Sequence, residues 1–270
     1  ASHGVTGISS KEASFSAWIT DGVRITWNTN TINTGHLLTV VLFGGADLTA
    51  RADTISLGTS TSAQTYSSLA AEPDLVIGAC QGGTNNNTIR NLHDITFGLC
   101  HNDKAGTVTQ RCIAQAEING GTDGVPISWM DDDKFLMQID TATPGTPVYN
   151  VALSSFTSTG FDFTCNNSAS SDDMGILALS LNGGKCSVGT YSPVTSATTD
   201  TIGASFTPKF CFLGLVGNTA VDTQEEDGDA GVFAISTMDA AAQSCNSIAL
   251  EDLSAVTDTQ SLVDNQAIKL

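Results

Sequence analysis

Short runs of alternating apolar and polar residues recur along the chain. Val23, Ile25 and Trp27 alternate with Arg24 and Thr26, which is the two-residue period of a strand with one buried face. The alternation predicts a half-buried strand in this segment, with Trp27 on its core face.

Similar runs predict a fold made of strands. Gly44-Gly45 and Gly183-Gly184 end two of the runs and predict turns, because glycine tolerates positive φ. An Ala-rich patch at 239–242 is compatible with one helical turn, but no long run has the 3.6-residue period of a helix. The pattern predicts an all-β fold, β-sandwich or jelly-roll-like, with about seven or eight strands per module. Besides the first strand, the runs lie at residues 37–43, 75–77, 107–118, 134–139, 161–163, 176–181 and 210–213.

The chain also contains an internal repeat. Gly22 aligns with Gly160, an offset of 138 residues (160 − 22 = 138), and the following matches keep a similar offset. We therefore interpret the chain as a tandem duplication, with a first module at 1–143, a second at 144–270 and a proline-containing hinge at 141–148. The further matches are Gly44-Gly45 with Gly183-Gly184, Pro73 with Pro208, Phe97 with Phe233, and residues 110–112 with 243–245.

Composition narrows the classes of partner. The chain has 10 Lys+Arg against 28 Asp+Glu and a formal charge of -18, so phosphate backbones and anionic membranes are expected to be repelled. With 40% apolar residues it has enough material for a core. It begins at Ala1, so we expect that any leader has been removed and that the protein is extracellular, on a cell surface or in a virion.

Seven cysteines leave two readings open. They have no CxxC spacing and no paired His ligands, which disfavours a zinc site. Disulfides in an oxidising compartment and buried free thiols remain alternatives, and the odd count leaves at least one cysteine unpaired. The seven are Cys80, Cys100, Cys112, Cys165, Cys186, Cys211 and Cys245.

No catalytic set is apparent. His93 precedes Asp94 and His101 lies near Asp103, but the chain has neither GxSxG nor HExxH. We interpret these histidines as solvated loop residues, and predict no catalytic residue and no cofactor.

Two polar features could bind ions or carry sugars. The acidic stretch at 222–229 suggests a calcium site, because calcium prefers oxygen ligands, although a solvated loop is the simpler interpretation. Asn86 and Asn166 begin N-glycosylation sequons. The candidate calcium ligands are Glu225, Glu226, Asp227 and Asp229, in a loop around Gly228, and a second acidic cluster at 131–133 is expected in a turn before a strand.

The segments FTSTGFDF (156–163), ILALSLNGG (176–184), KCSVGTYSP (185–193) and SFTPKFCF (205–212) carry a resemblance. They resemble a tandem β-sandwich repeat of predicted bacteriophage tail or surface proteins and of large repetitive bacterial surface proteins. The first half departs from it, with Gly22-Val23 in place of Gly-Phe and Glu72-Pro73-Asp74 in place of Phe-x-Pro-Lys. The resemblance implies a structural or adhesive role without catalytic residues.

The expected function is therefore that of a non-enzymatic structural protomer that forms a fibre or a virion component with copies of itself. The alternatives are an adhesin or carbohydrate-binding module, for which Trp18, Trp27 and Trp129 are the available tryptophans, and a hydrolase. Because the repeat runs off both ends, we expect residues 1–15 to complete the second module of a neighbouring chain by strand addition. The simpler alternative is that this segment packs on its own first module.

Overall fold

The computed structural model describes residues 11–20, 22–30, 40–57, 61–80, 92–118, 126–139, 147–166, 172–192, 201–218, 220–226, 230–251, 258–264 and 266. These residues form strands, turns and irregular segments, with no helix among them, which confirms the predicted all-β class. The chain divides into two compact units between Gly44 and Gly45, and each unit is described by itself.

The first unit contains one antiparallel hairpin, β1 (Lys11–Ile19) and β2 (Gly22–Asn30). Ile19 pairs with Gly22 at the turn, so that only two residues connect the strands. Asn28 Nδ2 donates a hydrogen bond of 2.6 Å to Ser14 Oγ across the hairpin.

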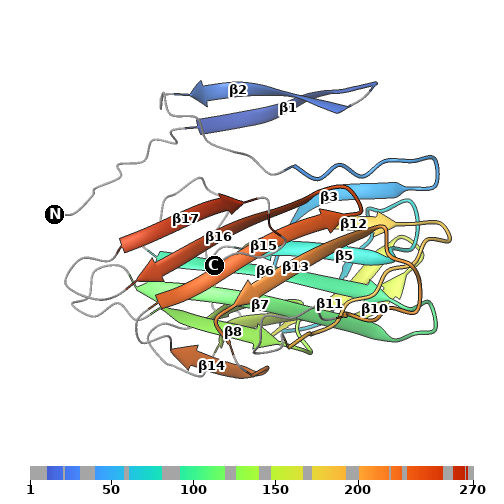
Figure 1. Ribbon diagram of the computed structural model, residues 1–270. Helices are drawn as coiled ribbons and strands as arrows, with labels where there is room; N and C mark the ends of the chain where they lie inside the picture. The colour runs from blue at the N-terminus through green and yellow to red at the C-terminus, as the bar shows by residue number, and fades with distance from the viewer. Residues whose placement is uncertain are drawn as a thin grey trace. The chain divides into compact units, whose positions relative to one another are not determined.

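A seven-stranded antiparallel sheet forms the middle layer of the second unit (Figure 1). Asp74 precedes its strand β5 and accepts a 2.7 Å hydrogen bond from the backbone N–H of Leu181, just after β12. In spatial order the strands are β14 (Thr223–Glu226), β8 (Ile127–Asp131), β7 (Val108–Ile118), β6 (Leu92–Asn102), β5 (Leu75–Cys80), β12 (Asp173–Ser180) and β3 (Thr49–Ser56).

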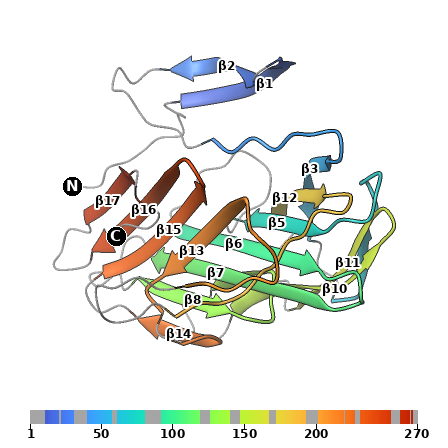
Figure 2. The same ribbon diagram turned by 45° about the vertical axis from the view of Figure 1, so that its right-hand side comes forward.

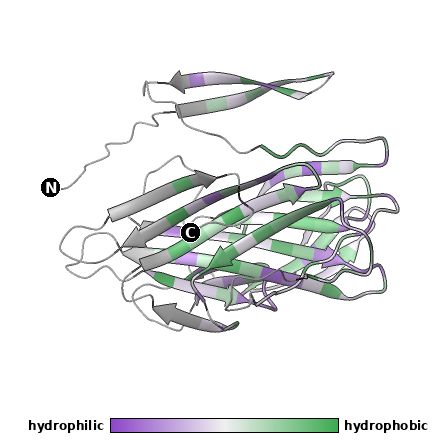
Figure 3. Cartoon of the chain, in the orientation of Figure 1, coloured by the Kyte–Doolittle hydropathy of each residue, from purple (hydrophilic) through white to green (hydrophobic). Residues whose placement is uncertain are grey.

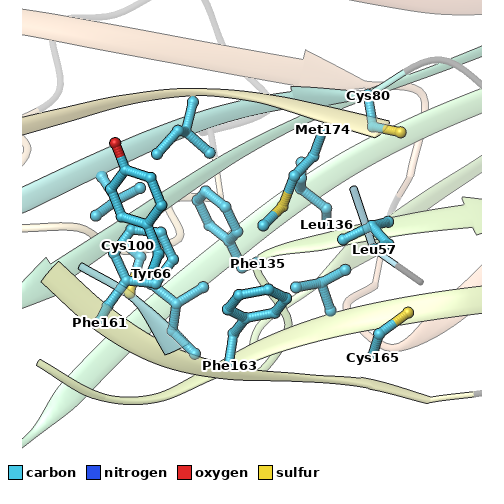
Figure 4. Packing of buried hydrophobic residues seen from close by; sticks show 14 of the residues in the cluster. Leu57, Tyr66, Cys80, Cys100, Phe135, Leu136, Phe161, Phe163, Cys165 and Met174 are labelled. Atoms are coloured by element: carbon cyan, nitrogen blue, oxygen red, sulfur yellow. The ribbon is translucent and has the colours of Figure 1, made fainter. Parts of the chain in front are cut away.

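A four-stranded sheet covers one face of the middle layer, and Figure 2 brings its side of the molecule forward. Phe135, Phe161 and Phe163 are fully buried between the two layers, and Figure 4 shows them beside Tyr66. This cluster is the main core, and it joins side chains from both halves of the sequence. The strands are, in order, β4 (Gln64–Tyr66), β11 (Gly160–Asn166), β10 (Pro147–Thr157) and β9 (Leu136–Ile139).

A third sheet packs on the opposite face of the middle layer. Val216 and Phe233 from this sheet form a buried cluster with Ile113 of β7. Its strand β13 is hydrophobic along most of its length (Figure 3). We call this layer the C-terminal sheet, which consists in order of β13 (Phe210–Val216), β15 (Ala230–Asp239), β16 (Gln243–Glu251) and β17 (Asp258–Asp264).

The described strands agree with most of the local predictions. Strands lie at 75–80, 108–118, 136–139, 160–166, 173–180 and 210–216, and Gly183 has the positive φ expected of its turn. Residues 40–43 lie outside strands, so the strand predicted at 37–43 is wrong for this part, while 37–39 lie outside the described residues. The patch at 239–242 is a tight hairpin turn, capped by Asp239, rather than a helical turn.

The strand pairing does not confirm two self-contained modules. Strand β12 of the second half lies between β5 and β3 of the first half, and β14 pairs with β8. Strand β11 likewise pairs with β4. Residues 141–146 of the predicted hinge lie outside the described residues, and Pro147 begins β10.

Candidate functional site

One face of the β1–β2 hairpin is apolar and open to solvent. Trp18 is 71% exposed, Phe15 58% and Trp27 49%, and the rings of Phe15 and Trp18 lie 5.2 Å apart. Trp27 is therefore exposed in the structure, where the sequence pattern predicted a core position. We call this surface the hairpin face, and its residues are Ala13, Phe15, Trp18, Val23, Ile25 and Trp27.

The β10–β11 hairpin has the same register as β1–β2. A bulge at Ser16 interrupts β1, and a bulge at Ser154, 138 residues later, interrupts β10. Around these bulges, six consecutive cross-strand pairs of the first hairpin recur in the second at the same offset, from Ile19–Gly22, which corresponds to Thr157–Gly160, to Ala13–Trp27, which corresponds to Val151–Cys165. The two hairpins thus share their register and the position of their bulge.

The equivalent face of β10–β11 is buried. Phe163, which corresponds to Ile25, is 1% exposed, and Leu153, which corresponds to Phe15, is 3% exposed. These residues face the middle layer and form part of the main core. A surface that has the hairpin's geometry and apolar pattern is therefore covered by a sheet elsewhere in the same chain.

The turn glycines differ in the same way. A Cβ atom on Gly160 would lie 1.8 Å from the backbone oxygen of Tyr66, so glycine is required where β11 approaches β4. A Cβ on Gly22 would meet no atom within 4 Å. Gly22 thus occupies the position of Gly160, but the close backbone contact that requires glycine is present only at Gly160.

The predicted acidic ligands are only partly described. Glu225 and Glu226 lie in strand β14, not in a loop, and Asp227 and Asp229 lie outside the described residues. Asp131 is the last residue of strand β8, and Asp132 and Asp133 follow it in the predicted turn. Asp131 Oδ1 accepts hydrogen bonds from the backbone N–H groups of Asp133 and Lys134 at 2.9 and 2.8 Å. In the described part of the chain, no three His, Cys, Asp or Glu residues are grouped to hold a metal ion.

The two candidate histidines lie in one strand. His93 belongs to β6, as does half-buried His101, whose pKa is lowered by burial. Asp103 caps the following turn by accepting hydrogen bonds from the backbone N–H groups of Ala105 and Thr107, which lower its pKa. The prediction that both histidines lie in loops is therefore wrong.

Burial alters two carboxyl groups. It raises the pKa of Asp94 in β6 to about 7, and the neighbouring Asp172 raises it further, against a hydrogen bond with Gln138. Burial also raises the pKa of Asp131 to about 6. Each group therefore releases its proton at a higher pH than an exposed aspartate, which does so near pH 4.

The remaining predicted residues are the sequon asparagines and the cysteines. Asn166 is exposed at the end of β11, and Asn86 lies outside the described residues. All seven cysteines are described as thiols, and no disulfide joins any two of them. Burial raises the pKa of most of them, for example that of Cys80 to about 12. The free-thiol alternative therefore agrees with the structure.

A small cavity of about 220 Å³ opens beside Glu72, Asn102, Lys104 and Phe156. It is smaller than the roughly 300–1,000 Å³ of typical ligand sites. Lys104 Nζ lies 3.2 Å from an oxygen of Asp74 and 3.7 Å from one of Glu72, so its charge is already paired.

Among the described residues, no helix has the length and apolar character that a membrane crossing needs. Comparison with known proteins gives no match to the chain from family models, from curated proteins or from solved structures.

Proposed function

We propose that this protein is a non-enzymatic structural protomer that assembles head-to-tail with copies of itself into an extracellular fibre or a virion component. The observation that carries the proposal is the exposed hairpin face, on which the side chains of Phe15, Trp18 and Trp27 are each about half exposed or more. Contiguous exposed apolar surface of this kind marks sites of protein–protein interaction.

The chemistry of the chain supports assembly rather than catalysis. The chain has a formal charge of -18, which disfavours non-specific association between copies. The exposed apolar face is therefore better suited to docking on one specific partner surface. Among the described residues, the carboxylates that act on His101 are Asp103, which caps a turn, and Asp74, which pairs with Lys104.

Sedimentation velocity and electron microscopy of purified protein test the proposal. Wild-type protein is expected to form linear assemblies, and the Trp18→Asp/Trp27→Asp variant is expected to remain monomeric. Thr26→Asp, on the opposite face of the same hairpin, is the matched control and is expected to assemble. A strictly monomeric wild-type protein at every concentration tested would contradict the proposal.

Carbohydrate binding is the second candidate function. Trp18 and Trp27 offer exposed aromatic platforms of the kind on which sugar rings stack. Glycan-array binding that Trp18→Ala abolishes would favour this adhesin function. Calcium and N-linked glycans stay predictions that mass spectrometry of native protein would test.

A further inference from the structure

We infer that residues 37–43 of one chain add as a strand to β13, the edge strand of the C-terminal sheet, of a second copy. This inference rests on the proposed self-assembly and supplies a strand-to-edge contact for it. We call residues 37–43 the donor segment, and its part 40–43 lies among the described residues. The pattern for the contact is the pairing of β12 with β5 in the middle layer.

Strand β13 is an apolar strand at the edge of its sheet. It pairs with β15 and is the last strand in the order of the C-terminal sheet (Figure 2). Its sequence, FCFLGLV, has no charged residue and no proline, and only Val216 in it is buried. Charged side chains and prolines usually protect an edge strand from pairing with another chain. Strand β3, at the edge of the middle layer, carries Arg51 and Asp53, whereas β13 has no such protection.

The first half of the chain has a similar meander in which this edge is covered. Strands β5–β6–β7–β8 follow one another as β13–β15–β16–β17 do. Pro73 lies two residues before β5 and Pro208 two residues before β13, at an offset of 135 (208 − 73 = 135). The edge of β5 that faces away from β6 pairs with β12 over six residues. An added strand would take the corresponding place beside β13.

The donor segment is the sequence match of β12 in the first half. Gly183-Gly184 follow β12 and Gly44-Gly45 follow the donor segment, at an offset of 139 (183 − 44 = 139). The same offset matches Leu179 of β12 with Val40 (179 − 40 = 139). Leu179 is 1% exposed, whereas Val40 is 54% exposed and lies outside strands. The described part of the donor segment thus carries apolar side chains of a core strand but forms no strand.

The receiving side differs from its match in the same way. Val76 of β5 is fully buried, whereas Cys211, 135 residues later (211 − 76 = 135), is half-buried. Cys80 is buried, whereas Leu215, at the same offset (215 − 80 = 135), is half-buried. Strand β13 and the donor segment therefore both have more exposed apolar surface than the strands that they match.

The pairing of β12 with β5 also predicts the register of the contact. Leu179 pairs with Leu75 in an antiparallel ladder, and the residues that match them are Val40 and Phe210 (210 − 75 = 135). We therefore expect Val40 of one copy opposite Phe210 of the other, in antiparallel orientation. Main-chain hydrogen bonds supply the affinity in strand addition of this kind. The contact lies at the edge of the C-terminal sheet and does not need access to its buried centre.

The contact joins different surfaces of identical chains. Such a heterologous contact generates a filament unless the rotation between copies closes a ring. It also moves the expected strand addition from residues 1–15 to the donor segment. Residues 11–15 pair with β2 in the first hairpin, and residues 1–10 lie outside the described residues.

Site-specific photo-crosslinking tests the pairing in the full chain. p-Benzoylphenylalanine is placed at Val40 in the donor segment, or at exposed Ser154 in β10 as the control, in a mixture of ¹⁴N- and ¹⁵N-labelled protein. We expect crosslinks from position 40 to peptides within 208–216, between chains of different isotope label. Position 154 is expected to give no crosslinks of this kind.

The outcomes separate this pairing from self-assembly in general. Crosslinks between chains that map outside 208–216, or no crosslinks in protein that sediments as an assembly, would overturn the pairing and leave self-assembly standing. Crosslinks to 208–216 confined to chains of one label would also overturn it, because the donor segment would then pair within its own chain. A strictly monomeric protein without crosslinks between chains would overturn both.

Proline substitutions give a second readout. Alternate residues of an added strand direct their N–H groups toward its neighbour, so either Val40→Pro or Val41→Pro removes a hydrogen bond of the ladder. We expect that variant to weaken assembly by about two- to tenfold in sedimentation. Ala46→Pro, at the second position of the turn from Gly45 to Leu48, is the control and is expected to assemble as wild type does. Circular dichroism confirms folding, and wild-type assembly of both valine variants would overturn the pairing.

Discussion

At the scale of single residues, the two turn glycines distinguish a buried contact from an open one. Gly160→Ala forces a Cβ against the backbone of Tyr66, and we expect it to lower the free energy of unfolding by about 1–3 kcal/mol or more. Gly22→Ala meets no atom and is expected to change it by no more than about 0.5 kcal/mol. Urea titrations of both variants measure the difference, and equal losses would show that the two hairpins have similar surroundings.

Asp94 makes stability depend on pH. Its pKa is about 7 in the folded protein against an ordinary value of 3.8, so the folded chain retains a proton that the unfolded chain releases. The stabilisation is therefore complete below about pH 4 and is lost as pH rises through 7, with a slope of up to about 1.4 kcal/mol per pH unit. We expect Asp94→Asn to remove this part of the slope in urea titrations from pH 4 to 8.

Asp131 also makes the protein less stable as pH rises, but it does so at lower pH than Asp94, because its pKa is about 6. The relevant readout is therefore the difference between wild type and Asp94→Asn at each pH. An identical slope in both proteins would contradict the assignment to Asp94.

At the scale of elements, a matched pair of truncations separates the two hairpins. Phe163→Ala removes a buried ring from the main core and is expected to lower the free energy of unfolding by about 3–5 kcal/mol. Ile25→Ala, at the equivalent position of β2, is expected to leave unfolding nearly unchanged and to weaken association. Urea unfolding measures the first effect and sedimentation the second; a large loss of stability in Ile25→Ala would indicate that the face is already covered within the chain.

Local alternation was sufficient to predict most strands, because apolar and polar residues alternate along a strand that has one buried face. It could not predict what covers a face. Trp27 alternates as a core residue does, yet it is exposed, whereas its equivalent Cys165 is fully buried. The sequence match of Gly22 with Gly160 already relates these two segments, and the structure gives both hairpins the same bulge and register. The pairing of β12 with β3 and β5 joins segments far apart in the chain, which no local pattern reveals.

At the scale of the whole molecule, net charge opposes the assembly that the hairpin face favours. Each copy carries a formal charge of -18, so neighbouring copies repel one another at low salt. The Debye length falls from about 30 Å at 0.01 M to about 10 Å at 0.1 M salt, and the apolar contact itself needs no ion pair. We expect assembly, followed by light scattering, to strengthen as sodium chloride rises over this range. Assembly that weakens with salt would point to a contact based on ion pairs.

The place of β12 in the middle layer also has a consequence for the order of synthesis. Strand β3 has β12 as its neighbour, and Ser56 hydrogen-bonds to Asp173, 117 residues later. A nascent chain therefore cannot join β3 to this layer until residue 180 has left the ribosome, and the hairpin that closes the core emerges only shortly before. A chain that ends at residue 143 would keep most strands of the middle layer but lack both the lid and the strand that links β5 to β3. On the ribosome, the main core therefore cannot close before β10, β11 and β12 of the second half have emerged.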